Sequence, residues 1–195
     1  MRKAEIKRKT KETDIVLSLD FDTSLEGQID TGSPFLDHML DLFRKHSGIG
    51  LSVVCRGDKD IDMHHSCEDI AICLGEAIGK ACGDKLGMER YGFYYITMDE
   101  ALARCCLDLS GRIGFVYNVA LPTARIGNLD TELIEHFFRS VAENAKMNLH
   151  LDLLRGTNTH HCIEGLFKAF ARALAMAISP SRRVQGIPST KGTLS

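Results

Sequence analysis

The sequence contains no tryptophan, only four prolines and no long hydrophobic run. Its apolar stretches are shorter than the roughly 18 residues that a transmembrane helix needs, which excludes a helical membrane protein. The basic residues 1–9 are not followed by the apolar segment of a signal peptide, so we expect a cytoplasmic protein. A formal net charge of −2 gives no reason to expect nucleic acid or an anionic membrane as a partner.

Cysteine is present without the patterns that give it a special role. The seven cysteines are an odd number, and no Cys-x-x-Cys occurs. A chain of 195 residues, of which 44% are hydrophobic, can bury a sizeable core without disulfide bonds. We therefore expect structural thiols in a globular protein.

Histidine, in contrast, occurs in a repeated pattern. Residues 64–68 read His-His-Ser-Cys-Glu, and residues 160–164, 96 positions later, read His-His-Cys-Ile-Glu. A histidine and a glutamate four residues apart share one face of a helix, so the first and last residues of each motif can hold one metal ion. The middle histidine points about 100° around the same helix and must serve another purpose.

A shorter motif is repeated at nearly the same distance before each His-His-x-x-Glu motif. Asp37-His38 lies 26 residues before the first His-His-x-x-Glu motif, and Glu135-His136 lies 24 residues before the second. A single histidine is often an ordinary core or surface residue, but chance placement would not reproduce both order and spacing. Six of the eight histidines fall into this pattern, which indicates an internal duplication. His46 and His150 have no matching glutamate, and for them the ordinary interpretation is favoured.

The periodicity of the apolar residues predicts the same order of elements in both halves. Strands are expected at 3–9, 15–21, around 28–30, 49–56, 91–98, 101–109, 113–119 and 149–154; for the apolar run 101–109 a helix is the alternative. Helices are expected at 34–47, from the first His-His-x-x-Glu motif to near 83, from 130 or 131 to about 145, and at 158–178. The predicted fold class is α+β, with two pseudo-symmetric repeats that each place two helices on one face of a small, mainly antiparallel sheet.

The domain organisation follows from this repetition. We expect a first repeat at 1–90, a second at 91–180 and a tail at 181–195 with a phosphate-binding loop. The repeats are expected to pack as one unit, side by side, so that their strands form one sheet with the helices on one face.

Pseudo-twofold symmetry also predicts how the metal ligands are sorted, since each ion should receive one helical clamp and two single histidines. The expected sets are His38, His65, His160 and Glu164 for one ion, and His64, Glu68, His136 and His161 for the other. Three imidazoles and one carboxylate suit Mn, Fe, Co, Ni or Zn better than Mg or Ca. An ion with open coordination positions would be catalytic.

Several basic or hydroxyl residues are candidates for an anionic ligand. Residues 188–192, Pro-Ser-Thr-Lys-Gly, read as a loop with free backbone amides, which suits a phosphate. Lys168 lies one turn beyond Glu164. Each signal is weak alone, because a solvated surface charge is the commoner explanation. The full candidate set is Arg90, Arg112, Lys168, Ser189 and Lys191.

Together these motifs resemble the imidazoleglycerol-phosphate dehydratase family of histidine biosynthesis. The resemblance covers nearly the whole chain from Glu12 onward, and the paired His-His-x-x-Glu motifs with Pro-Ser-Thr-Lys-Gly are its most specific part. The other matching stretches are 35–41, 98–101 and 108–112. Because no second catalytic domain is attached, the chain resembles the monofunctional form, with a fold similar to domain 2 of ribosomal protein S5.

The resemblance implies a hydro-lyase that converts D-erythro-imidazoleglycerol phosphate into imidazoleacetol phosphate through an imidazolate held by metal. It implies two Mn ions per active site, although the ligand types leave Zn, Fe, Co and Ni open. It also implies phosphate binding by the basic set above, a catalytic carboxylate at Glu12, and trimers that assemble into a 24-subunit shell with active sites between subunits.

Two other functions remain open at this point. A two-metal phosphohydrolase also pairs histidines and carboxylates around two ions, but it usually needs a bridging carboxylate, which the pattern does not offer. A metal-assembled shell protein without catalytic activity would use metal between subunits only for stability.

Overall fold

The computed structural model describes residues 2–24, 26–58, 60–183 and 185–194, and its strands form two separate four-stranded sheets. The first sheet has the order β1-β2-β4-β3, with parallel pairing of β3 and β4 and antiparallel pairing elsewhere. The second sheet repeats this plan as β5-β6-β10-β7, with β7 parallel to β10. The bounds are β1 Lys3–Lys9, β2 Thr13–Asp20, β3 Glu26–Asp30, β4 Gly50–Gly57, β5 Tyr91–Met98, β6 Ala101–Asp108, β7 Gly114–Asn118 and β10 Asn148–Arg155.

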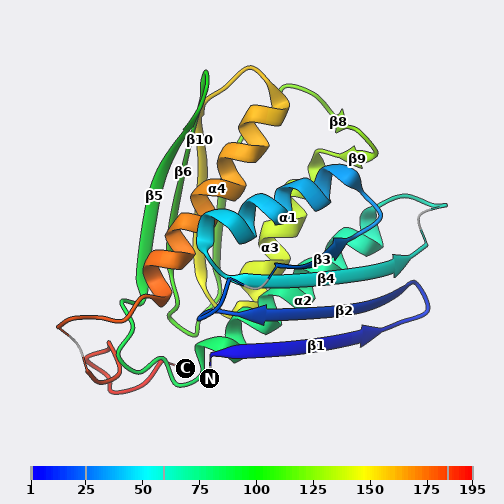
Figure 1. Cartoon of the computed structure of the whole chain (residues 1–195). Helices are drawn as coiled ribbons and strands as arrows, with labels where there is room; N and C mark the ends of the chain where they lie inside the picture. Colours follow the sequence, from blue (N-terminus) through cyan, green and yellow to red (C-terminus); the bar gives the residue numbers. More distant parts are fainter. Residues whose placement is uncertain (1, 25, 59, 184, 195) are drawn as a thin grey trace.

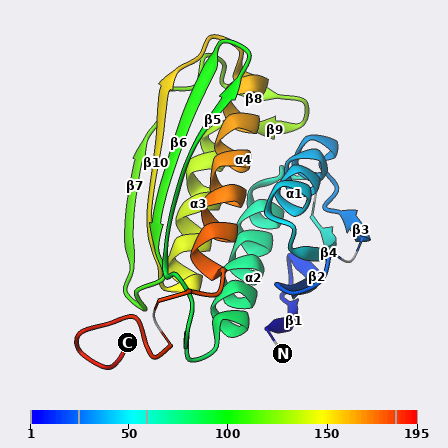
Figure 2. The ribbon, with the colours of Figure 1, turned by 60° about the vertical axis from the view of Figure 1, so that its left-hand side comes forward.

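The four helices lie between the two sheets (Figures 1 and 2). They are α1 Pro34–Ser47, α2 His64–Cys82, α3 Glu132–Ala145 and α4 Thr159–Ile178. Helices α1 and α2 cover the first sheet, α3 and α4 cover the second, and the two pairs meet through α2 against α3 and α1 against α4.

The predicted α+β class and the two repeats are confirmed, but the prediction of one continuous sheet is wrong. The helices are apolar on more than one face: α2 and α4 bury residues around most of their circumference. A helix of this kind needs cover on both sides, and a sheet on one side with helices on the other provides it. At Gly75 of α2 an added Cβ would lie 2.6 Å from the carbonyl oxygen of Val141, so the helix pair is closely packed.

The core runs through both repeats without a break. Phe43 of α1 stacks on Phe170 of α4, with ring centroids 5.6 Å apart. Phe138 of α3 contacts both Phe167 and Phe170 at centroid distances of 4.8 and 5.6 Å. Because each repeat contributes rings to this cluster, the packing that joins the helices also fixes their N-terminal ends relative to one another.

The helix ends explain how the histidines are presented. Ser33 caps α1 by accepting a hydrogen bond from the amide of Leu36, and Gly48 ends that helix with a φ of 71°, as predicted. Asn158 caps α4 through the amides of His160 and His161. At the start of α3, Thr131 occupies the cap position, but its hydroxyl donates to the carbonyl oxygen of Thr123 instead of capping the helix.

One element of the second repeat was not predicted. A small antiparallel hairpin of β8 Arg125–Ile126 and β9 Leu129–Asp130 lies in the segment 119–131 between β7 and α3. In the first repeat, only residues 31–33 join β3 to α1. Of the described helices, none is long and apolar enough to span a membrane.

Candidate metal centre and phosphate pocket

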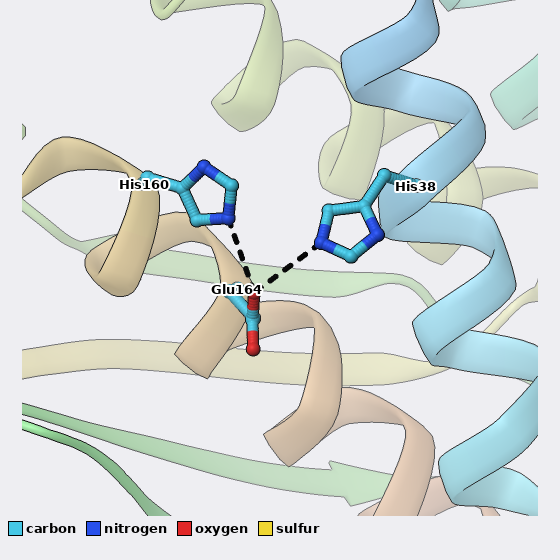
Figure 3. A group of neighbouring side chains, drawn as sticks. All are labelled: His38, His160 and Glu164. Carbon is cyan, nitrogen blue, oxygen red and sulfur yellow. Dashed lines mark hydrogen bonds and ion pairs between the residues drawn. The ribbon is translucent and has the colours of Figure 1, made fainter.

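The first group of possible metal ligands joins one helix from each repeat. His38 comes from the second turn of α1, and His160 and Glu164 come from the start of α4 (Figure 3). The Oε2 atom of Glu164 lies 3.2 Å from Nε2 of His160 and 3.4 Å from Nε2 of His38. This trio, which we call cluster 1, brings two ring nitrogens and one carboxylate oxygen within 4.8 Å of one another.

The second group is the pseudo-symmetric counterpart. In this cluster 2, His64 and Glu68 come from the start of α2 and His136 comes from α3. The rings of His64 and His136 have centroids 5.0 Å apart, and Nε2 of His136 lies 3.1 Å from Oε1 of Glu68. Both clusters thus combine a helical clamp of one repeat with a single histidine of the other, as the predicted sorting requires.

In cluster 2, one candidate ligand atom is buried without a hydrogen bond, which favours a metal ion at this position. The Nε2 atom of His136 is shielded from solvent and has no hydrogen-bond partner among the described residues, although Glu68 is close. A buried ring nitrogen without a hydrogen bond is costly unless another group uses it. A divalent transition ion between two imidazoles and a carboxylate would satisfy this atom.

In cluster 1 the carboxylate has a second partner. Lys168, one turn further along α4, makes an ion pair with Oε1 of Glu164, while Oε2 faces the two histidines. Burial alone would raise the pKa of Glu164, but the hydrogen bond and charge of Lys168, with His160, lower it overall. The carboxylate is therefore held ionised, in the form that binds a metal.

The middle histidines do not join these clusters within one chain. Nδ1 of His65 lies 2.9 Å from Oδ2 of Asp58, and Nδ1 of His161 lies 2.8 Å from Oε2 of Glu100. These hydrogen bonds raise the pKa of both histidines. The helical geometry turns each ring away from the clamp beside it, so within one chain His65 and His161 lie outside both clusters, and their role as metal ligands stays a prediction.

Glu12 lies close to one of these middle histidines. It is in the turn between β1 and β2, and its Oε1 atom is 3.7 Å from Nε2 of His65. The second repeat has a counterpart, since Asp99 in the turn between β5 and β6 places Oδ2 3.8 Å from Nε2 of His161. Each middle histidine thus has a carboxylate on both sides of its ring.

Four of the five predicted phosphate ligands line one cavity. Its volume is about 680 Å³, and its polar lining includes Arg90, Arg112, Ser189 and Lys191. Arg90 is held in place by Asp108, 2.6 Å from its Nε atom, and by the carbonyl oxygen of Pro188 at 2.8 Å. The hydrogen bond from Arg90 to Asp108 raises the pKa of the arginine, which stays a cation.

Lys168 does not line this cavity within one chain, and its role as a phosphate ligand stays a prediction. It lies in the middle of α4, one turn beyond Glu164, whereas the amide of Arg90 donates to the carbonyl oxygen of Ala177 near the C-terminal end of that helix. Ala177 lies 17 positions after His160, which corresponds to about 25 Å at the rise of an α-helix. Within one chain, the metal ligands and the anion pocket are therefore at opposite ends of α4.

Comparison with known proteins shows which family has this architecture. The family model for imidazoleglycerol-phosphate dehydratase matches residues 31–174. An imidazoleglycerol-phosphate dehydratase from Syntrophomonas wolfei is 54% identical over 99% of this chain and 98% of its own length. The one from Lactiplantibacillus plantarum is 52% identical over 100% of both chains.

The chain belongs to the imidazoleglycerol-phosphate dehydratase family. Solved structures of the family have the same fold. The crystal structure from Staphylococcus aureus has a TM-score of 0.84 and 43% identity over 92% of this chain and 99% of that one. The structure of the Pyrococcus furiosus protein in complex with (S)-C348 has a TM-score of 0.83 and 32% identity, covering 97% of this chain and 100% of that one.

Family membership confirms the predicted activity. The chain is a hydro-lyase that dehydrates imidazoleglycerol phosphate in histidine biosynthesis, and its substrate is a small molecule. The phosphohydrolase and the non-catalytic shell protein are not favoured. The two clusters of histidine and glutamate agree with metal binding in this family.

Sequence reasoning missed the residues that orient the candidate ligands. Asp58 and Glu100 hold the middle histidines, and Asp108 holds Arg90. Glu100 and Asp108 lie in stretches that resemble the family, and this resemblance could have identified them as site residues. Asp58 follows β4 in a polar turn that resembles any other turn, and its contact with His65 becomes visible only in three dimensions.

Proposed function

We propose that each active site of this dehydratase is completed between subunits and holds two Mn ions. Cluster 1 and cluster 2 would each supply three ligands, and a middle histidine of a neighbouring subunit would supply the fourth: His65 to cluster 1 and His161 to cluster 2. Zn, Fe, Co and Ni fit the same donors. The family membership supports a metal-dependent dehydration, and the ion and its number are our proposal.

The observation that carries this proposal is the separation of the two halves of the site along α4. Arg90 of the anion pocket is bonded to Ala177 of α4, which lies about 25 Å along the helix from His160, far more than the length of the substrate's three-carbon chain. A second subunit can bring its pocket to the metal end, where Lys168 would join the other phosphate ligands. A substrate can then contact metal and phosphate ligands at once.

The orientation of the middle histidines supports the same arrangement. A metal-ligating histidine commonly donates its other ring N–H to a carboxylate, which fixes the ring. Nδ1 of His65 and of His161 is bound to a carboxylate in this way, so Nε2 is the atom left for a metal. Both rings are partly exposed, with 33% and 25% of the side chain accessible, and can reach an ion on a neighbouring subunit.

The reaction removes water from a glycerol chain whose C–H bond is not acidified by a carbonyl. When bound, the metal pair supplies Lewis acidity to the imidazole ring of the substrate, which favours loss of the ring proton. The phosphate is held by the basic and hydroxyl set, and this fixes the distance of the substrate's imidazole ring from the metals. The set is Arg90, Arg112, Ser189, Lys191 and Lys168.

Glu12 is our candidate for the base that accepts the C–H proton. Its carboxylate is half-exposed and lies 3.7 Å from Nε2 of His65. In a site completed by that histidine, Glu12 would therefore lie close to the imidazole ring of the substrate. A carboxylate at this position can accept the proton from the side-chain carbon as hydroxide leaves, and the resulting enol then becomes the ketone.

The assembly and location are extensions of the same proposal. We infer that trimers of this chain form a 24-subunit shell in the cytoplasm, with the repeats 1–90 and 91–180 packed as one unit and the tail 181–195 closing the phosphate pocket. Support comes from the half-complete clusters and from the tail residues that line the pocket with Arg90.

The experiment removes metal with a chelator, restores Mn²⁺ alone, and supplies imidazoleglycerol phosphate. Formation of imidazoleacetol phosphate that depends on Mn²⁺ is the expected result. Release of inorganic phosphate would indicate a phosphohydrolase. Full turnover by the metal-free protein would contradict the metal centre, and turnover by an isolated monomer would contradict the shared site.

A further inference from the structure

The segment 119–131, which we call the strap, is the main difference between the two repeats, and it reaches cluster 1. Its hairpin lies over the ends of α1 and α4 in Figure 1. Its side-chain hydrogen bonds to the rest of the described chain reach Gly32, Ser33 and Thr159. These residues stand at the starts of the two helices that carry His38, His160 and Glu164.

The first attachment point is Asn128 at the tip of the hairpin. Its Oδ1 accepts a hydrogen bond from the hydroxyl of Ser33 at 2.6 Å, and its Nδ2 donates to the carbonyl oxygen of Gly32 at 3.2 Å. Ser33 is fully buried and is the N-cap of α1. Because the serine hydroxyl points to Asn128, its lone pairs remain available to the amide of Leu36, and the cap is fixed in one rotamer.

The second attachment point is Thr123. Its backbone amide and its hydroxyl both bond the hydroxyl of Thr159, at 3.1 and 2.9 Å. Thr159 is the first residue of α4, is 7% exposed and directly precedes His160. Phe35 in the first turn of α1 contacts the His160 ring edge to face, at a centroid distance of 5.3 Å. The strap thus fixes two helix starts that also touch each other.

At cluster 2 the support among the described residues is of another kind. Asp69, next to Glu68 on α2, accepts hydrogen bonds from Arg8 and Thr13 at 2.8 and 2.6 Å. No side-chain hydrogen bond of the described residues joins the strap to the start of α2. Met63 at the cap position of α2 makes no side-chain capping bond, and the amide of His64 is bonded by Asp62 of the same turn. Glu68 is 37% exposed, compared with 8% for Glu164. The same ligand types are therefore held at both helix starts by the strap in cluster 1, and by the turn of Asp62 and the contacts of Asp69 in cluster 2.

We propose that the strap preorganises cluster 1 and makes it the tighter of the two metal sites, with Asn128 and Thr159 as positioning residues. A ligand set held in its binding geometry loses less freedom when the ion enters. The inference rests on the metal centre proposed above, and it adds a difference in affinity that the duplicated ligand pattern alone does not contain.

The test measures Mn²⁺ affinity by calorimetric titration of the metal-stripped assembly in two backgrounds. Glu68→Gln disables cluster 2 and leaves cluster 1, and Glu164→Gln does the reverse. Asn128→Ala should weaken the remaining site about tenfold in the first background and by less than about twofold in the second. The control is Asn118→Ala, which removes an asparagine of β7 that bonds Asp152 on the sheet; it should change neither site.

Equal weakening in both backgrounds, or no weakening in either, would overturn the role of the strap. Absence of Mn²⁺ binding in both backgrounds and in the unmodified chain would instead refute the metal centre itself. Where a background variant fails to assemble, amide hydrogen exchange in the otherwise unmodified chain decides: Asn128→Ala should speed exchange at 36–40 and at 160–164 more than at 64–68, and a uniform change would contradict the inference.

Discussion

Cluster 1 and cluster 2 use the same ligand types in the same order but differ in their surroundings. Glu164 is nearly buried and paired with Lys168, whereas Glu68 has no lysine one turn further on and is partly exposed. The segment before α1 is three residues long, and the corresponding segment before α3 carries a hairpin. The duplication therefore preserved the donor atoms while the residues that hold and charge-balance them diverged.

The turns that carry Glu12 and Asp99 give the sharpest contrast between the repeats. Glu12→Gln should lower turnover by about 10²- to 10⁴-fold, because it removes the proposed proton acceptor, while both metals and substrate affinity are retained. Asp99→Asn, its pseudo-symmetric control, should lose less than about tenfold. Steady-state kinetics with metal analysis measure both, and an unchanged Glu12→Gln enzyme would remove Glu12 from the mechanism.

The anion pocket belongs to the second repeat and the tail, which predicts an asymmetric response to loss of arginine. Arg112→Ala should raise KM for imidazoleglycerol phosphate by about 10- to 100-fold, since a hydrogen bond to a charged group is worth about 1.5–3 kcal/mol. Arg56→Ala, which removes an exposed ion pair with Asp30 on the first sheet, is the control. If both variants shift KM equally, the pocket does not bind the phosphate.

The unequal burial of the two glutamates predicts unequal stability of the metal-free protein. Glu164→Gln should cost about 1–3 kcal/mol of unfolding free energy, because it leaves the largely buried ammonium of Lys168 without its partner. Glu68→Gln should cost less than about 1 kcal/mol. Chemical denaturation in the presence of a chelator compares them, and equal losses would show that burial does not distinguish the clusters.

The smallest expected effect is the pH dependence contributed by Glu100. Its hydrogen bonds, led by that from His161, lower the pKa of the carboxyl from 4.5 to about 2. The lowered pKa stabilises the folded state above pH 4.5, and this contribution is lost as the pH falls toward 2. The stability difference between the native chain and Glu100→Gln should therefore shrink over that interval. A difference that stays constant from pH 6 to pH 2 would contradict this.

Much of the fold could be predicted because apolar periodicity and helix caps are local signals. Ser33-Pro34, Gly48 and Asn158 marked helix ends that the structure contains. The separation of the two sheets could not be predicted, because it depends on which helix faces meet across the repeats. The strap was missed because its strands are two residues each, too short for any periodicity.

Part of the geometry of the candidate site could be predicted from the sequence, and part could not. Spacing identified His64 with Glu68 and His160 with Glu164, since residues four apart in a helix must be neighbours. The same geometry predicted that His65 and His161 point away from the clamps beside them, but it could not show that Asp58 and Glu100 hold their rings. The distance between metal ligands and anion pocket is likewise a property of the folded helix and not of the motifs.

The most direct test of the shared site is complementation between two inactive variants. Glu164→Gln lacks a metal ligand and Arg112→Ala lacks a phosphate ligand, so each homo-oligomer should have little activity. When the two chains are mixed, dissociated and reassembled with Mn²⁺, some sites will combine an intact cluster from one chain with an intact pocket from another. We expect activity to return to a substantial fraction of the unmodified level; mixed assemblies no more active than the separate variants would contradict the shared site.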